Sequence, residues 1–558
     1  MFRLLVLVCL LCAIPLASCA VEPTATIPPP TLPPTITPEP ARPIPTRPPT
    51  ATPAPEAPTL WLEQNLDSTL RATIQEIAAA QNLTIVSDPA EAALRITLVE
   101  SADPLLVTEE VYVVADRFAT LRNGVKFGDV QQVWEGKPTD TIKELIVTND
   151  TATALTPLLG APSDLVRIVA PEALTESVWQ TPHSLAILPF DQLNPRLSAQ
   201  PLDGQNILDR KLDLKNYSLV VRVYLEGTAE RAPAFYNALH DRLAATNRDP
   251  NRMTSLVMTG VTAMGRFTAQ AIDDSGDPAF PARVVAPILS QADITHVSNE
   301  IPFVDDCPPN LVHDSIRLCS KSANIKTFQV LGVDIVGLTG NHAGDFGYDN
   351  YLKTLDLYKA NGMKYYAGGR NEEEARQPLV IEHNGNKLAF LGANSFGPQS
   401  YWATKDKPGT NGYDAEKMKQ AIAQARTQAD LVFVEYQADE VYAYTPDSTN
   451  VQIFRRTLND GADVVTGVQN HHPASIEFAK NGAREILYGL GNFSFDQMYD
   501  DEVRQGLIPR HLIYNGKLLQ TELLTTMLDK YAQPRWATPQ ERENILRGVF
   551  GASGFKLE

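Results

Sequence analysis

The sequence predicts an α/β protein built from two successive blocks of alternating strands and helices. Runs rich in β-branched residues, such as YSLVVRVYL (217–225), alternate with amphipathic segments such as LRATIQEIAAAQN (70–82). In the second block, polar clusters follow apolar runs, which is typical of ligand sites at the carboxyl ends of strands. With 558 residues, 43% of them apolar and 20% charged, the chain is long enough for two or three domains with their own cores.

The first twenty residues, MFRLLVLVCLLCAIPLASCA, have the layout of an export signal: Arg3, an apolar run and then small residues. The stretch LASC, ending at Cys19, predicts a lipoprotein signal peptide over residues 1–18, with lipid attached to the Cys19 sulfur. The alternative is an ordinary secretory signal with a chance cysteine. We expect an exported protein held by lipid on the outer face of a bacterial membrane, with its body in water.

A Pro- and Thr-rich segment follows the predicted lipidation site and cannot form a packed core. We expect residues 19–59 to be an extended linker of polyproline II type. The remaining predicted boundaries are an α/β domain at 60–248, a second α/β domain at 249–528 and a C-terminal tail at 529–558. The tail contains PQERENILRGVF (539–550), which predicts a final helix.

Charge and cysteine content narrow the function classes. The 66 acidic side chains exceed the 48 basic ones, giving a net charge of -18, which argues against nucleic acid as a partner. Of five cysteines, two lie in the predicted signal peptide and Cys19 is the predicted anchor. The remaining pair, Cys307 and Cys319, predicts a disulfide in an exported protein, with a metal site as the less favoured alternative.

The first block shows a recurring order of strand and helix segments. The segments YVVADRF (112–118), DVQQVWEG (129–136), TATALTPLLG (151–160) and LAILPFDQL (185–193) follow one another. This order resembles the second type of periplasmic solute-binding domain, as found in phosphate-binding proteins. The resemblance implies an anion- or solute-sensing domain, and a spacer domain is the alternative. The predicted strands are LTIVSD (83–88), EAALRITLVE (91–100), EEVYVVAD (109–116), SLAILPFD (184–191) and YSLVVRVYL (217–225).

The second block contains more strand signals and three clear helices. The pair Asn384-Gly385 between two apolar runs predicts a hairpin turn. The predicted strands are TSLVMTGVTAM (254–264), ITHVSNEIPF (294–303), VDIVGLTGNH (333–342), LVIEHNGNKLAFLGANS (379–395), DLVFVEYQ (430–437), DVVTGVQNHH (463–472) and REILYGLGNFSF (484–495). The predicted helices are DNYLKTLDLYKANG (349–362), AEKMKQAIAQARTQ (415–428) and NVQIFRRTLNDG (450–461).

Three polar clusters follow these strands: SNE (298–300), GNH (340–342) and NHHP (470–473). Each alone could be an ordinary turn, but their repeated position after a strand predicts a common site. The motifs TGVTAMGR (259–266), SNEIPF (298–303), GNHAGDFGYDNYLKTLDLYKANGMKYYAGG (340–369), GADVVTGVQNHHP (461–473) and YGLGNFSFDQM (488–498) resemble the CapA family of poly-γ-glutamate capsule biosynthesis proteins. That family is a branch of the calcineurin-like metallophosphoesterases, and the resemblance implies a four-layer α-β-β-α sandwich.

The resemblance also implies a ligand set, which this sequence only partly keeps. The family's first motif has Asp where Val261 stands. Its HWGxE motif aligns with YQADE, so that Tyr436 replaces the His and Glu440 is kept. Its GxHPH motif aligns with GVQNH, so that Gln469 replaces the first His and His471 is the second.

These losses remove one carboxylate and two imidazoles, so a two-metal centre is disfavoured. A single divalent ion such as Mn, Mg or Ca on Glu300, Asn341 and His471 is one alternative, and a metal-free polar pocket is the other. His342 and Asp345 form a candidate catalytic acid–base pair, although Asp345 could instead cap the next helix. The candidate substrate-binding residues are Asn299, Glu440, Gln469, His472 and Asn492.

The leading functional hypothesis is a CapA-type surface lipoprotein acting in synthesis or export of poly-γ-glutamate or a related envelope polymer. Its expected partners are that anionic polymer, or an envelope glycan, and the membrane through the lipid anchor. One alternative is a hydrolase of phosphoesters or polymer bonds with a reduced metal site. Another is a sensor that binds anions or solutes through its first block.

Overall fold

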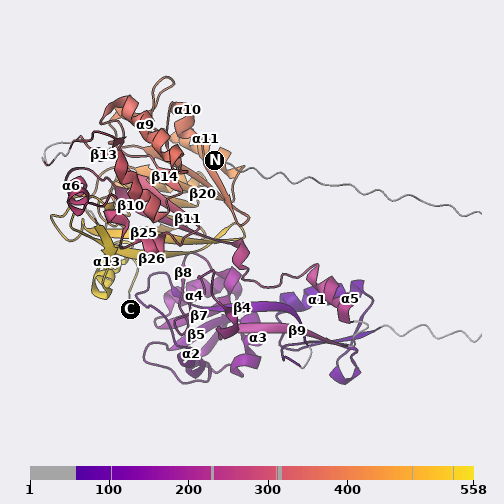
Figure 1. The fold of residues 1–558 in the computed structure, drawn as a ribbon. Helices are drawn as coiled ribbons and strands as arrows, with labels where there is room; N and C mark the ends of the chain where they lie inside the picture. Colours follow the sequence, from indigo (N-terminus) through magenta and orange to yellow (C-terminus); the bar gives the residue numbers. More distant parts are fainter. Residues whose placement is uncertain are drawn as a thin grey trace, which may run out of the picture. The chain divides into compact units, whose positions relative to one another are not determined.

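The computed structural model describes residues 58–101, 104–227, 232–308, 311, 317–479, 482–531 and 533–557 (Figure 1). Ala57–Glu558 forms one compact unit, separate from Met1–Glu56. The predicted signal peptide, Cys19 and nearly all of the Pro/Thr-rich linker therefore lie outside the described residues. None of the described helices is long and apolar enough to cross a bilayer.

The first block is built on one mixed sheet in the order β2-β1-β3-β9-β4-β7-β5-β6, with β8 paired to β4. Each of the strands predicted in this block overlaps an observed strand. The strands are β1 Thr59–Leu62, β2 Thr84–Ile85, β3 Leu94–Thr97, β4 Leu105–Arg117, β5 Glu144–Thr148, β6 Val166–Val169, β7 Ser184–Pro189, β8 Leu197–Ala199 and β9 Val220–Gly227. The helices are α1 Ser68–Ala80, α2 Phe127–Trp134, α3 Asn149–Leu159, α4 Leu174–Gln180 and α5 Ala232–His240.

Helix α1 shows how local sequence fixes these elements. The Asp67 carboxylate accepts the backbone N–H groups of Thr69 and Leu70, which starts the helix at Ser68. Its buried residues are Leu70, Ile74, Ile77 and Ala78, spaced as one helical face. That face packs with α5 against β1, β3 and β9 in one hydrophobic cluster, while β4, β5 and β7 share another. The sheet therefore carries two separate cores.

The second block contains two sheets. The first has the order β15-β14-β11-β10-β25-β26-β27, with β24 paired to β10. The second has the order β17-β18-β20-β21-β23-β22. The first sheet comprises β10 Met253–Thr262, β11 Ile294–Asn299, β14 Ile335–Gly337, β15 Lys364–Tyr366, β24 Asn492–Ser494, β25 Gln505–Tyr514, β26 Lys517–Asp529 and β27 Gln533–Trp536. The second comprises β17 Leu379–His383, β18 Asn386–Asn394, β20 Leu431–Gln437, β21 Val464–Gly467, β22 Ile476–Phe478 and β23 Glu485–Leu487.

Helices cover the outer faces of both sheets, giving the four layers that the sequence predicted (Figure 1). Strand residues alternate between layers: Leu431 and Phe433 of β20 pack between the sheets, whereas Val432 and Val434 pack against α11 and α12. The helices are α6 Arg266–Ser275, α7 Ala286–Leu289, α8 Ile325–Leu331, α9 Gly347–Ala360, α10 Glu372–Arg376, α11 Ala415–Arg426, α12 Ser448–Asn459 and α13 Pro539–Ala552. Two small ladders pair β12 Phe303–Val304 with β13 Ser320–Lys321, and β16 Gly368–Gly369 with β19 Gly409–Thr410.

Two local predictions have clear outcomes. The hairpin between β17 and β18 is confirmed: Asn384 and Gly385 have φ values of 49° and 77°, as a turn of type I′ requires. The tail was expected to supply only a helix. Helix α13 is present, but β27 precedes it and extends the first sheet by pairing with β26. The predicted end of the second domain at residue 528 therefore cuts through this sheet.

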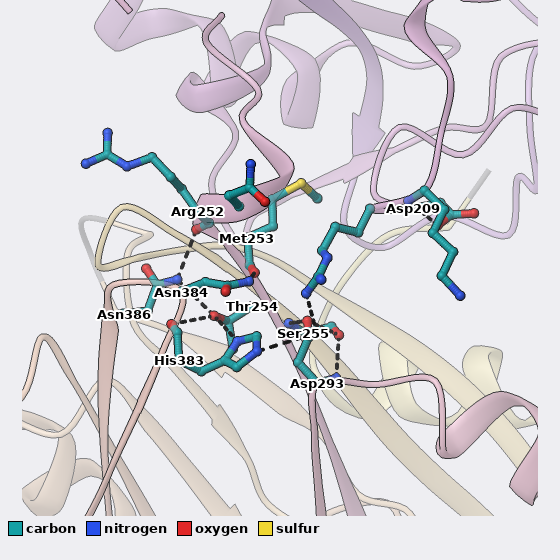
Figure 2. A network of polar contacts seen from close by, with 12 residues as sticks. Asp209, Arg252, Met253, Thr254, Ser255, Asp293, His383, Asn384 and Asn386 are labelled. Carbon is teal, nitrogen blue, oxygen red and sulfur yellow. Dashed lines mark hydrogen bonds and ion pairs between the residues drawn. The ribbon is translucent and has the colours of Figure 1, made fainter. Parts of the chain in front are cut away.

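Polar contacts join the two sheets where β10 begins (Figure 2). Asp293 Oδ2 accepts hydrogen bonds from the backbone N–H and hydroxyl of Ser255, both at 2.9 Å. The Thr254 hydroxyl donates to the His383 carbonyl at 3.0 Å, and the Asn386 amide donates to the Thr254 hydroxyl at 2.9 Å. This network holds β10 against the hairpin of the second sheet at the amino end of β10. The predicted site lies at its other end.

Candidate functional site

The carboxyl ends of strands from both sheets bring the predicted site residues together. Glu300 follows β11, Asn341 follows β14, Gln437 ends β20 and Gln469 follows β21. A Cβ atom at Gly340 would lie 2.5 Å from the Glu300 Cα atom, so only glycine lets this loop approach so closely. The sequence GNH thus places Asn341 directly beside Glu300.

Gln437 is the centre of this cluster. Its side-chain nitrogen lies 3.1 Å from Glu300 Oε1 and 3.0 Å from Asn341 Oδ1, and it also contacts Gln469 Oε1. All four side chains are buried. An amide NH₂ group can donate two hydrogen bonds, so two N–H bonds serve three oxygen acceptors. The cluster is held together by an amide donor that faces oxygens alone.

This donor set does not fit a divalent metal. A cation would need several oxygens to face it, but Glu300 Oε1 and Asn341 Oδ1 face the Gln437 amide, which leaves Glu300 Oε2 as the unpartnered oxygen of this pair among the described residues. His471, the third predicted ligand, has no hydrogen bond or ion pair to this cluster within the described residues. Val261 is buried and offers no donor. In the part of the chain that the structure describes, no three His, Cys, Asp or Glu side chains are grouped as a metal site would require.

Sequence reasoning singled out Tyr436 and not its neighbour Gln437, which the structure places in the cluster. Tyr436 was expected at the position of the family's His, but its side chain is buried on the helix-facing side of β20. Its hydroxyl lies 2.7 Å from the Thr457 hydroxyl, and its ring lies 5.3 Å from that of Phe454. Since neighbouring strand residues face opposite sides, a shift of one residue exchanges a core residue for a site residue. The alternation Leu431, Phe433, Glu435, Gln437 was the available signal.

His342 and Asp345 form a close pair. The His342 Nδ1 atom lies 2.7 Å from Asp345 Oδ2. Burial lowers the pKa of His342, but the hydrogen bond that its Nδ1–H donates to Asp345 and the charges of Glu300 and Asp345 outweigh it and hold the pKa above its usual value. The alternative role for Asp345, capping α9, does not occur, because Phe346 is the N-cap residue and no side chain caps this helix.

A disulfide supports this pair. Cys307 and Cys319 are bonded, as expected from the sequence. The backbone N–H of Leu318, next to Cys319, donates to Asp345 Oδ2 at 2.6 Å. Asp345 therefore accepts two hydrogen bonds on one oxygen, and the disulfide fixes the segment that supplies one of them.

His471 lies in a neighbouring aromatic arm of the site. Its Nδ1 atom is 2.8 Å from Asn492 Oδ1, and its Nε2 atom is 3.7 Å from Glu440 Oε1. Its ring stacks on Phe495 with centroids 5.0 Å apart and on Tyr442 with centroids 5.7 Å apart. His471 therefore contacts two other predicted residues, Asn492 and Glu440.

Two predicted substrate-binding residues point elsewhere. Asn299 donates to the Tyr358 hydroxyl at 2.7 Å and to the Ile301 carbonyl at 2.6 Å, which directs it toward α9. His472 bonds the Pro473 carbonyl, packs against Tyr444, and has a pKa lowered by burial. Both are turned away from Gln437 by backbone alternation.

Arg266 and Asp496 complete the site and were not singled out from the sequence. The guanidinium makes two hydrogen bonds to the Asp496 carboxylate, at 2.9 and 2.5 Å. It also lies 5.3 Å from the centre of the Phe495 ring, on which His471 stacks. This positive charge is thus already paired.

A buried acidic group lies one layer below the cluster. The Glu435 carboxylate accepts hydrogen bonds from the hydroxyls of Thr339 and Ser298 at 2.8 and 3.0 Å. Its second oxygen is 3.5 Å from His296 Nε2 and has no hydrogen bond within the described residues. Burial raises the pKa of Glu435 to about 7, against the opposing hydrogen bonds from Thr339, Ser298 and Tyr366. Polar groups thus continue from the site into the space between the sheets.

Comparison with known proteins places this site in a family. Residues 255–497 match the family described as bacterial capsule synthesis protein PGA_cap. The chain is similar to the capsule biosynthesis protein CapA of Bacillus anthracis, with 26% identity over 282 residues, covering 50% of this chain and 68% of that protein.

Two solved structures are similar in fold to parts of the chain. A putative 5'-nucleotidase from Staphylococcus aureus in complex with alpha-ketoglutarate has 12% identity and a TM-score of 0.34, covering 53% of this chain and 57% of its own. An ABC-type phosphate transport receptor from Vibrio cholerae has 12% identity and a TM-score of 0.25. The match covers 33% of this chain and 93% of the receptor. The resemblance to CapA proteins predicted from the motifs is confirmed by the sequence matches: residues 255–497 match the PGA_cap family, which belongs to the metallophosphoesterase-like superfamily.

Proposed function

We infer that the protein is an exported, lipid-anchored component of capsule or poly-γ-glutamate synthesis, and that its PGA_cap domain binds the polymer rather than hydrolysing it. The family description and the name of the Bacillus anthracis relative support the role in capsule synthesis. The LASC stretch ending at Cys19 and the Pro/Thr-rich linker support attachment to the outer face of the membrane.

One observation carries the choice of binding over hydrolysis: the Gln437 amide faces Glu300, Asn341 and Gln469. In a two-metal phosphoesterase, cations polarise the substrate and generate the nucleophile. Here a neutral N–H donor stands among the oxygens that would hold a cation. The site keeps the shape of its family without a donor set for that chemistry.

The accessible edge of the site suits a carboxylate polymer. The His342 side chain is 20% exposed, whereas Glu300, Asn341 and Gln437 are buried. Because its pKa is raised, His342 carries positive charge over a wider pH range than an ordinary histidine. A protonated imidazole at this edge can pair with a free α-carboxylate of the polymer.

Calorimetric titration of the purified chain with poly-γ-glutamate tests this proposal. We expect saturable binding that weakens about tenfold in His342→Gln, as the loss of one charged hydrogen bond requires. His240→Gln, at an exposed position of α5, is the matched control and should bind as the unaltered chain does. Absence of binding, or equal weakening by both variants, would contradict a polymer site at His342.

A second candidate function is hydrolysis with a reduced metal site. The observation in its favour is Glu300 Oε2, which is buried and has no hydrogen-bond partner within the described residues. Together with the His342–Asp345 pair, it could support acid–base chemistry. Turnover of model phosphoesters with added Mn or Mg, abolished by Glu300→Gln, would favour this function over polymer binding.

A further inference from the structure

A large cavity lies beside β4 and the N-termini of α1 and α3 of the first block, and residues 249, 252, 514 and 515 of the second block complete its lining. Its volume is about 940 Å³. Cavities of roughly 300–1,000 Å³ hold organic ligands, so this one is large for a bare ion. The PGA_cap match begins at residue 255 and does not include this block.

The lining of this cavity is acidic. Four carboxylates of the first block line it: Asp67, Glu110, Asp150 and Asp191. Within the described residues, Arg252 is the one basic side chain in the lining. An inorganic anion would therefore enter a region of like charge. This lining does not support the anion-binding role expected from the strand order.

Helix N-termini are the usual anion-binding feature of such domains, but both are already occupied here. The Asp67 carboxylate accepts backbone N–H groups of the first turn of α1. At α3, the Thr148 hydroxyl accepts the backbone N–H of Thr151. The Ser68 hydroxyl donates to Asp150 Oδ2 at 2.9 Å. The chain's own side chains thus use part of the N–H donors at both helix starts, and two acidic side chains, Asp67 and Asp150, stand there.

Two groups in the cavity lack partners. Thr108, Glu110 and Tyr112 alternate along β4 and all line the cavity, so their side chains share one face of the strand. The Tyr112 side chain is nearly fully buried, with 2% exposure of the residue. Among the described residues, neither its hydroxyl nor the Glu110 carboxylate has a hydrogen-bond or ion-pair partner. A buried tyrosine normally bonds through its hydroxyl, so this one is oriented for a ligand.

We propose that this cavity binds a small organic cation carrying an ammonium or guanidinium group, which donates to Glu110 and Asp191 and packs against Tyr112. The carboxylates supply charge-assisted acceptors, and the tyrosine ring supplies a face for a cation. Burial, followed by the charges of Asp191 and Asp67, raises the pKa of Glu110 to about 7. A bound cation stabilises the charged form of Glu110, so binding releases a proton near neutral pH.

The test is calorimetry and thermal unfolding of the full chain with agmatine, putrescine and spermidine. Inorganic phosphate, glutamate and glucose are the comparison ligands. We expect at least one of the cations to bind saturably and raise the unfolding midpoint, with tighter binding at pH 8 than at pH 6. Calorimetry in two buffers of different ionisation enthalpy should show the released proton.

Three variants locate the site. Glu110→Gln should weaken cation binding about tenfold, and Tyr112→Phe, which removes only the hydroxyl, about threefold. Glu135→Gln makes the same charge change at the half-exposed end of α2 and should have no effect. The proposal is overturned if no cation binds, if phosphate or glucose binds better, or if Glu110→Gln and Glu135→Gln behave alike.

Discussion

The strand-end cluster of the PGA_cap domain and the cavity of the first block both withdraw carboxylates from water, but they satisfy them differently. At the cluster, the Gln437 amide donates to Glu300 from within the protein. In the cavity, Glu110 and Tyr112 have no such donor among the described residues. A buried acceptor that is left unpaired costs free energy. The cluster supplies a donor from the chain to Glu300 Oε1, although Glu300 Oε2 has none among the described residues. In the cavity, we propose that a ligand supplies the donors.

The largest expected effect comes from reversing the role of Gln437. Gln437→Glu places a second carboxylate against Glu300 and removes the shared donor. We expect a loss of about 4 kcal/mol in the free energy of unfolding at pH 7.5, measured by denaturant titration. Millimolar Mg or Mn should recover part of this loss, because the variant offers two carboxylates to one cation.

Gln437→Leu is the matched variant, since it removes the donor without adding charge. It should cost about 2 kcal/mol and show no response to metal ions. Gln420→Leu, at an exposed position of α11, should change stability little. If Mg stabilised the unaltered chain as much as it stabilised Gln437→Glu, the cluster would already bind a cation. The claim that the Gln437 amide is its donor would then be contradicted.

The next effect concerns Glu435, which lies beneath the cluster and keeps one oxygen unpaired. Its pKa is raised from 4.5 to about 7 in the folded chain. The stabilising contribution is fully present below pH 4.5 and is lost as pH rises toward 7, because the unfolded state ionises first. The change should amount to roughly 3 kcal/mol over that range.

Glu435→Gln should remove this pH dependence. As pH rises from 4.5 to 7, the free energy of unfolding should therefore fall in the unaltered chain more than in the variant. Denaturant titrations at several pH values measure it. If the free energies of unfolding of the two proteins changed with pH in parallel, the raised pKa of Glu435 would be contradicted. Glu435 would then be ionised at neutral pH, with its second oxygen accepting a hydrogen bond from another donor.

The smallest expected effect is at Asp345. Asp345→Asn keeps an oxygen for the Leu318 N–H but loses the negative charge beside His342. The His342 pKa should fall, as an NMR titration would show, and stability should drop by about 1 kcal/mol. An unchanged His342 pKa would contradict this role of Asp345. It would mean that the charge of Glu300 alone raises the His342 pKa.

Sequence patterns predicted the scaffold better than the site. The hairpin at Asn384-Gly385 was predictable because its turn chemistry is local. Gln437 was harder to predict, because every residue of β20 is buried and only the short alternation Phe433, Glu435, Gln437 marks the side of the strand that faces the site. The acidic lining of the first cavity was also hidden, since Asp67, Glu110 and Asp191 meet only after the chain folds.

The metal content of the full chain, purified without chelator and measured by inductively coupled plasma mass spectrometry, tests the central claim most directly. That claim is that the Gln437 amide takes the place of a cation among Glu300, Asn341 and Gln469. We predict substoichiometric metal, unchanged after dialysis against Mn, and more metal retained by Gln437→Glu. One tightly held Mn, Mg or Ca ion per unaltered chain, lost in Glu300→Gln, would contradict it.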